Sequence, residues 1–155
     1  MRCHCVPIIK HDNEFYFMLA EHVKNSEWNG FYEEDGLENT RFETALKAVF
    51  EQTWGMVGLK TKLAQSTVIY SSRKKNNYFS FIHVDMGFNT STCINRVINY
   101  NNTMHRRSLV DDDIIKVRWF TLDELFSFKN VSQELMLLLL EDLHKFRNDL
   151  HLLAL

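Results

Sequence analysis

The chain has 155 residues, which suits one compact domain and is too short for two domains with a core each. Apolar residues make up 45% of the sequence and charged residues 25%, with five Gly and one Pro, so a disordered or collagen-like chain is excluded. Eighteen basic and twenty acidic residues give a formal net charge of −2. This balance argues against bulk electrostatic binding to nucleic acid or to an anionic membrane, although a local basic patch remains open. We expect a single domain over residues 1–155.

No membrane or secretory segment is expected. The longest apolar run, Leu135–Leu140, has six residues, whereas a membrane span needs about twenty. Pro7 interrupts the only apolar stretch near the start, which is too short for a secretory signal. The three cysteines, Cys3, Cys5 and Cys93, cannot all pair within one chain, which favours a reduced, cytoplasmic compartment.

Two β-hairpins are predicted, each from two apolar runs that flank a polar turn. The first joins Cys3–Ile9 to Phe15–Ala20, and both arms are apolar on both faces, so we expect helices or loops to cover the sheet on two sides. The second joins Lys60–Tyr70 to Tyr78–Val84 through a turn over residues 71–77.

The polar segment Glu21–Glu38 lies between the first hairpin and a predicted helix. Its sequence predicts a long loop anchored by Trp28 and Phe31. Arg41–Trp54 shows helical periodicity, with Gly55 as the expected C-terminal cap. Its predicted buried stripe is Phe42, Ala45, Leu46, Val49 and Phe50, and its solvated row is Glu43, Lys47 and Glu51.

The C-terminal third begins with a polar, Asn-rich segment, 88–113, which predicts a long loop. Ile114–Phe120 predicts a strand, and Thr121 with Glu124 forms a capping box that predicts a short helix. Ser132–Leu153 predicts a last helix, and its apolar stripe packs either on the sheet or in a homodimer seam. That stripe is Met136, Leu139, Leu143, Phe146, Leu150 and Leu153. The order of elements favours an α/β (α+β) fold with helices on both faces of a mixed sheet.

The segment Gly36–Met56, GLENTRFETALKAVFEQTWGM, resembles the Nudix box, G-x5-E-x7-R-E-U-x-E-E-x-G-U, of the MutT-like pyrophosphohydrolases. Residues 28–31 resemble the family's aromatic entry to the box, and residues 117–125 are similar to its closing strand and helix. The resemblance implies a Nudix fold, an α/β/α sandwich with the mixed sheet between helices. It also implies Mg²⁺ or Mn²⁺ held by box glutamates, because a hard divalent cation prefers anionic oxygens and helps to position the attacking water.

The carboxylates of this box are mostly missing. Aligned without gaps from Gly55, the helix matches none of the three glutamates. With one inserted residue at Trp54, Glu51 matches one of them and Lys47 matches the arginine. In both alignments Gln52 stands at one of the paired glutamates, where it offers a carbonyl oxygen without charge. The helix keeps the apolar residues through which it packs and lacks most of the glutamates that the resemblance assigns to hydrolysis.

Our first hypothesis is therefore a Nudix-fold protein, weak or inactive in hydrolysis, that binds a nucleotide-like or phosphorylated ligand. The ligand-binding residues that the resemblance suggests are Arg41, Lys47, Gln52, Trp28 and Phe31. The alternative is an active Mg²⁺-dependent hydrolase of nucleoside-diphosphate derivatives with relocated carboxylates. Its catalytic residues would be Glu51 and Glu38, and its metal ligands Glu38, Glu51 and Asp112. Otherwise the acidic groups 33–35 and 111–113 are solvated loop residues.

A third hypothesis is an interaction module for RNA or protein. Arg73, Lys74 and Lys75 lie at the predicted tip of the second hairpin, and basic groups beside aromatic ones suit single-stranded nucleic acid. The aromatic residues there, Phe79 and Phe81, share one face of a strand, and the core is their more common place. Cys3-His4-Cys5 does not have the spacing of a zinc site, so we expect buried cysteines.

Overall fold

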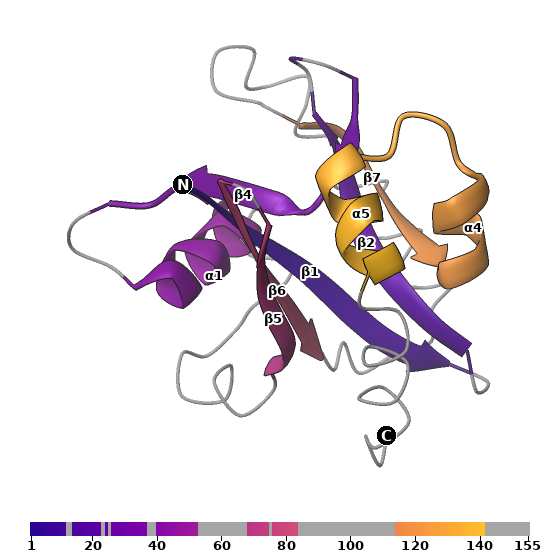
Figure 1. Cartoon of the computed structure of the whole chain (residues 1–155), viewed down its shortest axis with the longest axis horizontal. Coiled ribbons are helices and arrows are strands. Elements are labelled where there is room, and N and C mark those ends of the chain that lie inside the picture. Colours follow the sequence, from indigo (N-terminus) through magenta and orange to yellow (C-terminus); the bar gives the residue numbers. More distant parts are fainter. Residues whose placement is uncertain are drawn as a thin grey trace.

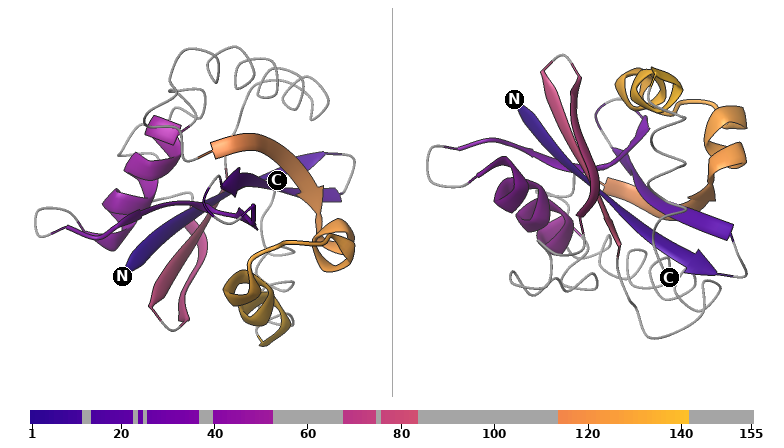
Figure 2. Two further views of the ribbon diagram at one scale, coloured as in Figure 1. Left: turned by 90° about the horizontal axis from the view of Figure 1, so that it is seen from above. Right: turned by 60° about the horizontal axis from the view of Figure 1, so that its bottom comes forward.

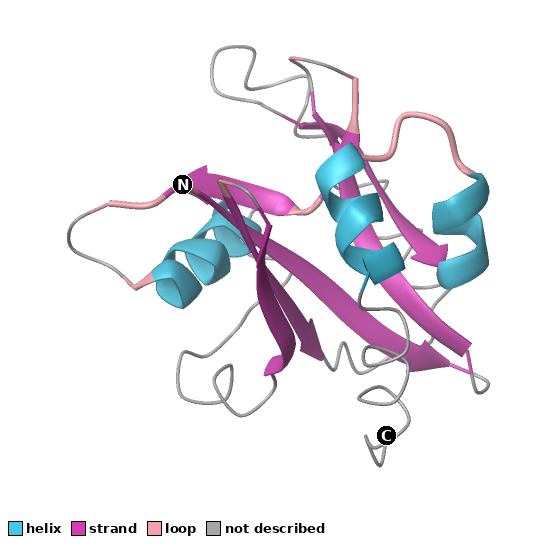
Figure 3. Ribbon diagram, in the orientation of Figure 1, coloured by secondary structure: helices cyan, strands magenta, loops and turns pink. Residues whose placement is uncertain are grey.

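The structure is a computed structural model, and it describes residues 1–11, 14–22, 24, 26–36, 40–52, 68–74, 76–83 and 114–141. Within these ranges, one mixed sheet of seven strands lies between helices (Figures 1 and 3). The strands are β1 Arg2–His11, β2 Glu14–His22, β3 Trp28–Asn29, β4 Phe31–Glu34, β5 Val68–Lys74, β6 Asn77–His83 and β7 Ile114–Thr121. The helices are α1 Arg41–Gln52, α4 Leu122–Ser127 and α5 Gln133–Glu141.

Both predicted hairpins are confirmed within the described residues; residues 60–67 and Val84 of the second hairpin lie outside them. The main path of the sheet runs β3-β2-β1-β6-β5, with β4 added to β1 and β7 added to β2. Strands β1 and β6 are parallel, and the other pairs are antiparallel, which makes the sheet mixed. The second hairpin has a shorter turn than predicted, because β5 continues to Lys74 and pairs there with Asn77. The polar residues 71–74 lie on paired strand because main-chain hydrogen bonds do not depend on side-chain polarity.

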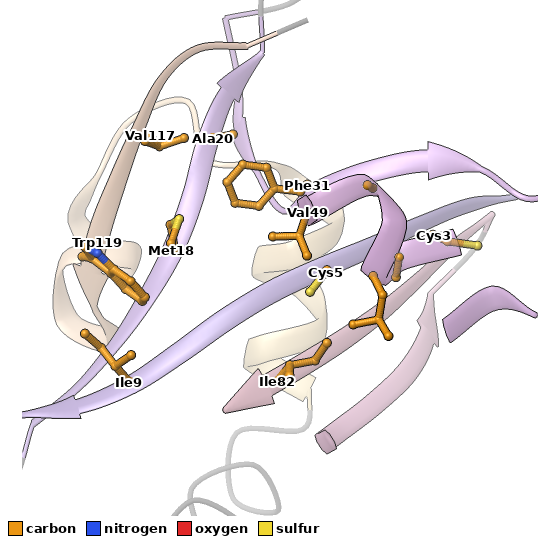
Figure 4. Packing of buried hydrophobic residues seen from close by; sticks show 13 residues of the cluster. Cys3, Cys5, Ile9, Met18, Ala20, Phe31, Val49, Ile82, Val117 and Trp119 are labelled. Atoms are coloured by element: carbon orange, nitrogen blue, oxygen red, sulfur yellow. The ribbon is translucent and has the colours of Figure 1, made fainter. Parts of the chain in front are cut away.

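The helices cover opposite faces of the sheet, as the two-sided apolar pattern predicts (Figure 2). Helix α1 packs on one face over a first cluster of buried side chains that includes Cys3, Cys5 and Phe31 (Figure 4). Helices α4 and α5 pack on the other face over a second cluster that includes Phe79 and Phe81. The expected α/β/α sandwich is thus confirmed, as are the buried cysteines and the core position of the two β6 aromatics.

Helix α1 begins after Thr40, whose Oγ1 accepts a hydrogen bond from the Glu43 N–H at 3.1 Å. The predicted helix is confirmed up to Gln52, and residues 53–55, including the expected cap, lie outside the described residues. One member of the predicted stripe is wrong, since Phe50 is 50% exposed. The buried face instead includes Thr44 and Ala48, because the way α1 lies on the sheet turns that side of the helix inward and position 50 outward.

The long loop predicted over residues 21–38 is wrong in its middle. Strand β3 pairs with β2, and strand β4 pairs with β1, so this stretch adds two short strands to the sheet. Between them, Gly30 approaches β1 so closely that a Cβ there would lie 3.1 Å from the Cys5 carbonyl oxygen. A short strand that pairs with the edge of an existing strand needs no long apolar run. The polar composition of the segment therefore gives no strand signal.

Strand β1 changes partner along one of its edges. Residues Arg2–Cys5 pair with β4, and Ile8–His11 pair with β2. The Arg2 N–H is donated toward the opposite edge, to the Asn76 carbonyl. Since successive residues alternate, the Pro7 nitrogen faces the edge where β4 has ended and β2 has not begun. A proline is tolerated inside this strand because its missing N–H falls in that gap.

The closing segment follows its prediction. Thr121 Oγ1 accepts from the Glu124 N–H, and Glu124 Oε1 accepts from the Thr121 N–H, so the capping box at α4 is formed. On α5 the buried residues are Leu135, Leu138 and Leu139, whereas Met136 of the predicted stripe is half-buried. Residues 84–113 and 142–155, with the rest of that stripe and the homodimer seam, lie outside the described residues. None of the described helices has the length and apolarity to cross a membrane.

Candidate functional site

The candidate site lies where the C-terminal end of α1 meets β4. Gln52 Nε2 donates a hydrogen bond to the backbone carbonyl of Tyr32, with a nitrogen–oxygen distance of 2.9 Å. Because Phe31 points into the first cluster and side chains alternate along a strand, Glu33 points to the same face, toward α1. The end of the helix and the strand therefore bring Glu33 close to Glu51.

The two carboxyl groups form a close pair. Burial, a side-chain hydrogen bond with Glu51 and the negative charge of Glu51 together raise the pKa of Glu33, and the positive charge of Lys47 opposes them. A hydrogen bond between two carboxyl groups requires a proton on one of them. Lys47 Nζ lies 3.9 Å from Glu51 Oε1 in an exposed ion pair, which adds little stability. Glu33 is therefore easier to protonate than an isolated glutamate.

The oxygen atoms here suit a divalent cation only in part. Glu33 and Glu51 supply carboxylates, and Gln52 Oε1 is a buried carbonyl oxygen without a hydrogen-bond partner. A hard cation accepts carboxylate and carbonyl oxygens as ligands, but it prefers more than two anionic oxygens. Among the described residues, no group of three or more His, Cys, Asp or Glu side chains gathers as a metal site. Mg²⁺ bound here would polarise a phosphate oxygen, and the pair alone would hold it weakly.

The sequence-predicted site residues fall into separate places. Glu51, Lys47 and Gln52 meet at the end of α1, as the resemblance suggests. Arg41 is exposed at the other end of this helix, about 16 Å away along its axis. Its charge acts instead on Asp35, whose pKa is lowered mainly by a side-chain hydrogen bond with the N-terminal ammonium. Glu38 and Asp112 lie outside the described residues.

The two aromatic residues predicted to bind ligand lie in the core. Phe31 has no exposed surface and packs in the first cluster, beneath α1. Trp28 is 7% exposed and packs in the second cluster, with its ring centroid 5.2 Å from that of Phe120. They therefore pack on opposite faces of the sheet and do not form one aromatic surface. Their burial fits the predicted anchoring role, but they anchor strands β3 and β4 and not a loop.

Glu33 is the site residue that the sequence hypotheses did not select. The sequence alone indicates a solvated loop for residues 33–35, because it gives no signal for strand β4. Recognising Phe31–Glu34 as a strand would have placed Glu33 on the face of the buried Phe31, beside the helix. Its neighbour Glu34 behaves as expected for a surface residue and forms an ion pair with Arg2 at 3.5 Å.

The basic hairpin lies apart from this site along the chain. Arg73 and Lys74 end β5, Lys75 lies outside the described residues, and β6 begins at Asn77. The tip lies beside the start of β1, because Asn77 pairs with Arg2 and the Asn76 carbonyl accepts the Arg2 N–H. This places the backbone of the basic segment at a sheet end, where strand turns meet solvent.

No protein-family model matches the sequence, and no curated protein matches it. Among solved structures, the chain is similar to the NUDIX domain of Shewanella oneidensis NrtR complexed with ADP ribose. That match has a TM-score of 0.49 and 9% sequence identity, and covers 88% of this chain and 81% of that one. A second similar structure is Shewanella oneidensis NrtR complexed with a 27mer DNA, with a TM-score of 0.47 and 11% identity. That match covers 88% of this chain and 57% of the other, so the present chain spans little more than half of it.

Proposed function

We propose that this chain binds a nucleotide-like or phosphorylated ligand on a Nudix-type scaffold and hydrolyses it slowly or not at all. The supporting observation is the carboxyl pair at the end of α1. The described residues bring two carboxyl groups together there, Glu33 and Glu51, and burial and Glu51 raise the pKa of Glu33, whereas the box resemblance implies several ionised glutamates. A cation that must stay bound while a pyrophosphate is cleaved needs more anionic oxygens than these.

The position of Gln52 supports the same proposal. Its amide nitrogen is committed to the Tyr32 carbonyl, so the side chain holds β4 against α1. A glutamate at this position could not donate that hydrogen bond while ionised. The residue that replaces a box glutamate therefore serves the packing of the helix.

A thermal-shift panel tests the proposal. The probes are ADP-ribose, nucleoside diphosphates and other nucleoside-diphosphate derivatives, with and without MgCl₂, and release of phosphate or mononucleotide is measured in parallel. We expect at least one probe to raise the melting temperature without turnover; at a hundredfold excess over Kd the stabilisation is about 2.7 kcal/mol. The proposal fails if no probe shifts the melting temperature, or if Mg²⁺-dependent turnover is rapid.

A second candidate function is favoured by the close contact of Glu33 and Glu51. A carboxyl group whose pKa is raised by burial and by a neighbouring carboxyl group, as at Glu33, is typical of catalytic sites. A third ligand such as Glu38 or Asp112 would complete a relocated metal site. The expectation is then Mg²⁺-dependent turnover that Glu51→Gln and Glu33→Gln both abolish. Glu43→Gln, on the same helix but in its first turn, is the matched control and should leave turnover unchanged.

The same panel separates the third hypothesis. Oligonucleotides are included at low and high salt, and binding that weakens with salt and in Lys74→Glu would assign the protein to nucleic-acid interaction instead. Retention of nucleotide binding in Lys74→Glu is expected from the proposal, since the carboxyl pair and the hairpin tip belong to different elements.

A further inference from the structure

A stack of four rings, those of His4, His22, Tyr32 and Phe79, lies on the face of the sheet opposite α1. The Tyr32 ring centroid lies 4.9 Å from that of His4 and 4.6 Å from that of His22. On its other side His4 stacks on Phe79, with centroids 4.3 Å apart and an interplanar angle of 21°. Strands β1, β2, β4 and β6 each contribute one of these residues. The stack therefore joins four strands at one point.

His4 is held as a neutral ring. It has no exposed surface, and its Nε2 lies 2.8 Å from Asn77 Oδ1. An amide oxygen only accepts, so Nε2 carries the hydrogen and Nδ1 carries the lone pair. Nδ1 is buried and has no hydrogen-bond partner. A proton added there would create a charge in the core with no acceptor at that atom.

The groups around His4 compensate such a charge only in part. The hydrogen bond with Asn77 of β6 favours protonation, whereas the charges of His22 on β2 and Arg2 on β1 oppose it. Phe79 of β6 and Tyr32 of β4 contribute uncharged rings. Burial is the largest influence, and the pKa of His4 is lowered to about 3. Within the part of the chain that the structure describes, no carboxylate acts on this ring.

The two rings that contact His4 differ in how firmly they are held. Phe79 is fully buried in the second cluster, whereas Tyr32 is half-buried. Tyr32 belongs to a strand of four residues, and among the described strands β4 pairs with β1 alone. Of the two rings that contact His4, Tyr32 on its short strand is therefore the one that moves with less disruption of the core.

We propose that acidification releases strand β4 from the sheet, because a proton on His4 Nδ1 expels Tyr32 from its place beside the imidazole. The same strand carries the Tyr32 carbonyl that binds Gln52 and the Glu33 carboxyl that pairs with Glu51. Release of β4 therefore dismantles the candidate site on the opposite face. This inference concerns the strand itself and does not depend on the proposed function or on any ligand.

The size of the effect follows from linkage. A histidine that titrates at its ordinary value in the released state and at about 3 in the closed state is protonated far more readily after release. The equilibrium constant for release then rises roughly a hundredfold between about pH 7 and about pH 4.5. This rise in the equilibrium constant applies only to local openings that expose His4 to solvent.

Hydrogen exchange measured by mass spectrometry on the full chain tests the inference. Peptides covering Phe31–Glu34 are compared with peptides from β2 and β7 at about pH 7 and about pH 4.5, after correction for the intrinsic exchange rates. We expect protection of β4 to fall by up to about a hundredfold, while β2 and β7 keep theirs. Equal losses in all three strands, or no loss in β4, would overturn it.

A variant and a control attribute the effect to His4. His4→Gln keeps a donor for Asn77 but cannot be protonated, so its β4 protection should not change over this pH range. His83→Gln, at the end of β6, is the matched control and should behave as the unmodified protein does. If His4→Gln does not fold, the NMR titration of the His4 imidazole in the unmodified chain decides. Its midpoint must coincide with the loss of β4 protection, and a different midpoint contradicts the inference.

Discussion

Gln52 on α1 and Tyr32 on β4 are joined by a hydrogen bond of 2.9 Å from the side-chain amide to the backbone carbonyl. The contact fixes the end of the helix to the strand that carries Glu33. In the alignment of the sequence with the Nudix box, Gln52 occupies the position of one of the paired glutamates. A residue that must donate a hydrogen bond here cannot at the same time be an ionised metal ligand.

Restoring the motif at this position should destabilise the protein. In Gln52→Glu an ionised carboxylate would face the Tyr32 carbonyl oxygen, so we expect a loss of about 1–3 kcal/mol in the free energy of unfolding near neutral pH. Near pH 3.5 the protonated side chain can donate again, and the loss should shrink. Gln52→Leu, which never donates, should be destabilised under both conditions. Urea denaturation at the two pH values measures the differences, and an unimpaired Gln52→Glu near neutral pH would contradict this account.

Removing the charge of Glu51 should have a pH-dependent effect. The folded state raises the pKa of Glu33, so it binds the Glu33 proton more tightly than the unfolded chain does. Relative stability is therefore present at low pH and is lost as pH rises through the raised pKa. Glu51→Gln removes two causes of that shift. Its melting temperature, relative to the unmodified protein, should thus increase from about pH 4 to about pH 7.

Two observations would control this prediction. Glu43→Gln, on the first turn of the same helix, should show a constant difference from the unmodified protein across the range. Loss of the exposed Lys47–Glu51 pair works in the opposite direction, but such pairs contribute at most about 1 kcal/mol. A difference that falls as pH rises would show that Glu33 and Glu51 do not interact as described.

Alanine substitutions of Phe31 and Phe50 should differ in their effect on stability, because the first ring is buried and the second is exposed. Phe31→Ala removes a fully buried ring and should cost about 3–5 kcal/mol of unfolding free energy. Phe50→Ala truncates a ring that is 50% exposed and should change that free energy by no more than about 0.5 kcal/mol. Chemical denaturation of both variants measures this. Equal losses would contradict the burial of Phe31, and a loss of ligand binding without a loss of stability would return it to a binding role.

Local patterns in the sequence account for much of the fold. The hairpin of β1 and β2, helix α1 and the Thr121–Glu124 capping box were predicted because their signals lie within a few neighbouring residues. Strand β3 was not predicted because its two residues are too few for a strand pattern, and strand β4 was not because it is stabilised by the edge of β1, far earlier in the chain. Phe50 was misplaced for a related reason, since only the angle at which α1 lies on the sheet decides which side of the stripe is covered.

The candidate site was predicted in part. The box resemblance predicts Glu51 and Gln52 as site residues, and both lie at the C-terminal end of α1. Their partners on β4, Glu33 and the Tyr32 carbonyl, lie about twenty residues earlier in the chain. No periodicity within the helix could indicate them, because the contact depends on the register between β4 and β1. The missing element was a tertiary pairing, and the residue types themselves gave no signal for it.

The change of partner at Pro7 divides the molecule into two flanks. One flank is β4 with α1, joined to the first half of β1; the other is β2 with β7, joined to its second half. Among the described strands, only β1 and β6 run through both. The main-chain pairing of one flank can therefore open while that of the other stays closed, and substitutions at the end of α1 do not require matching ones in β2 and β7.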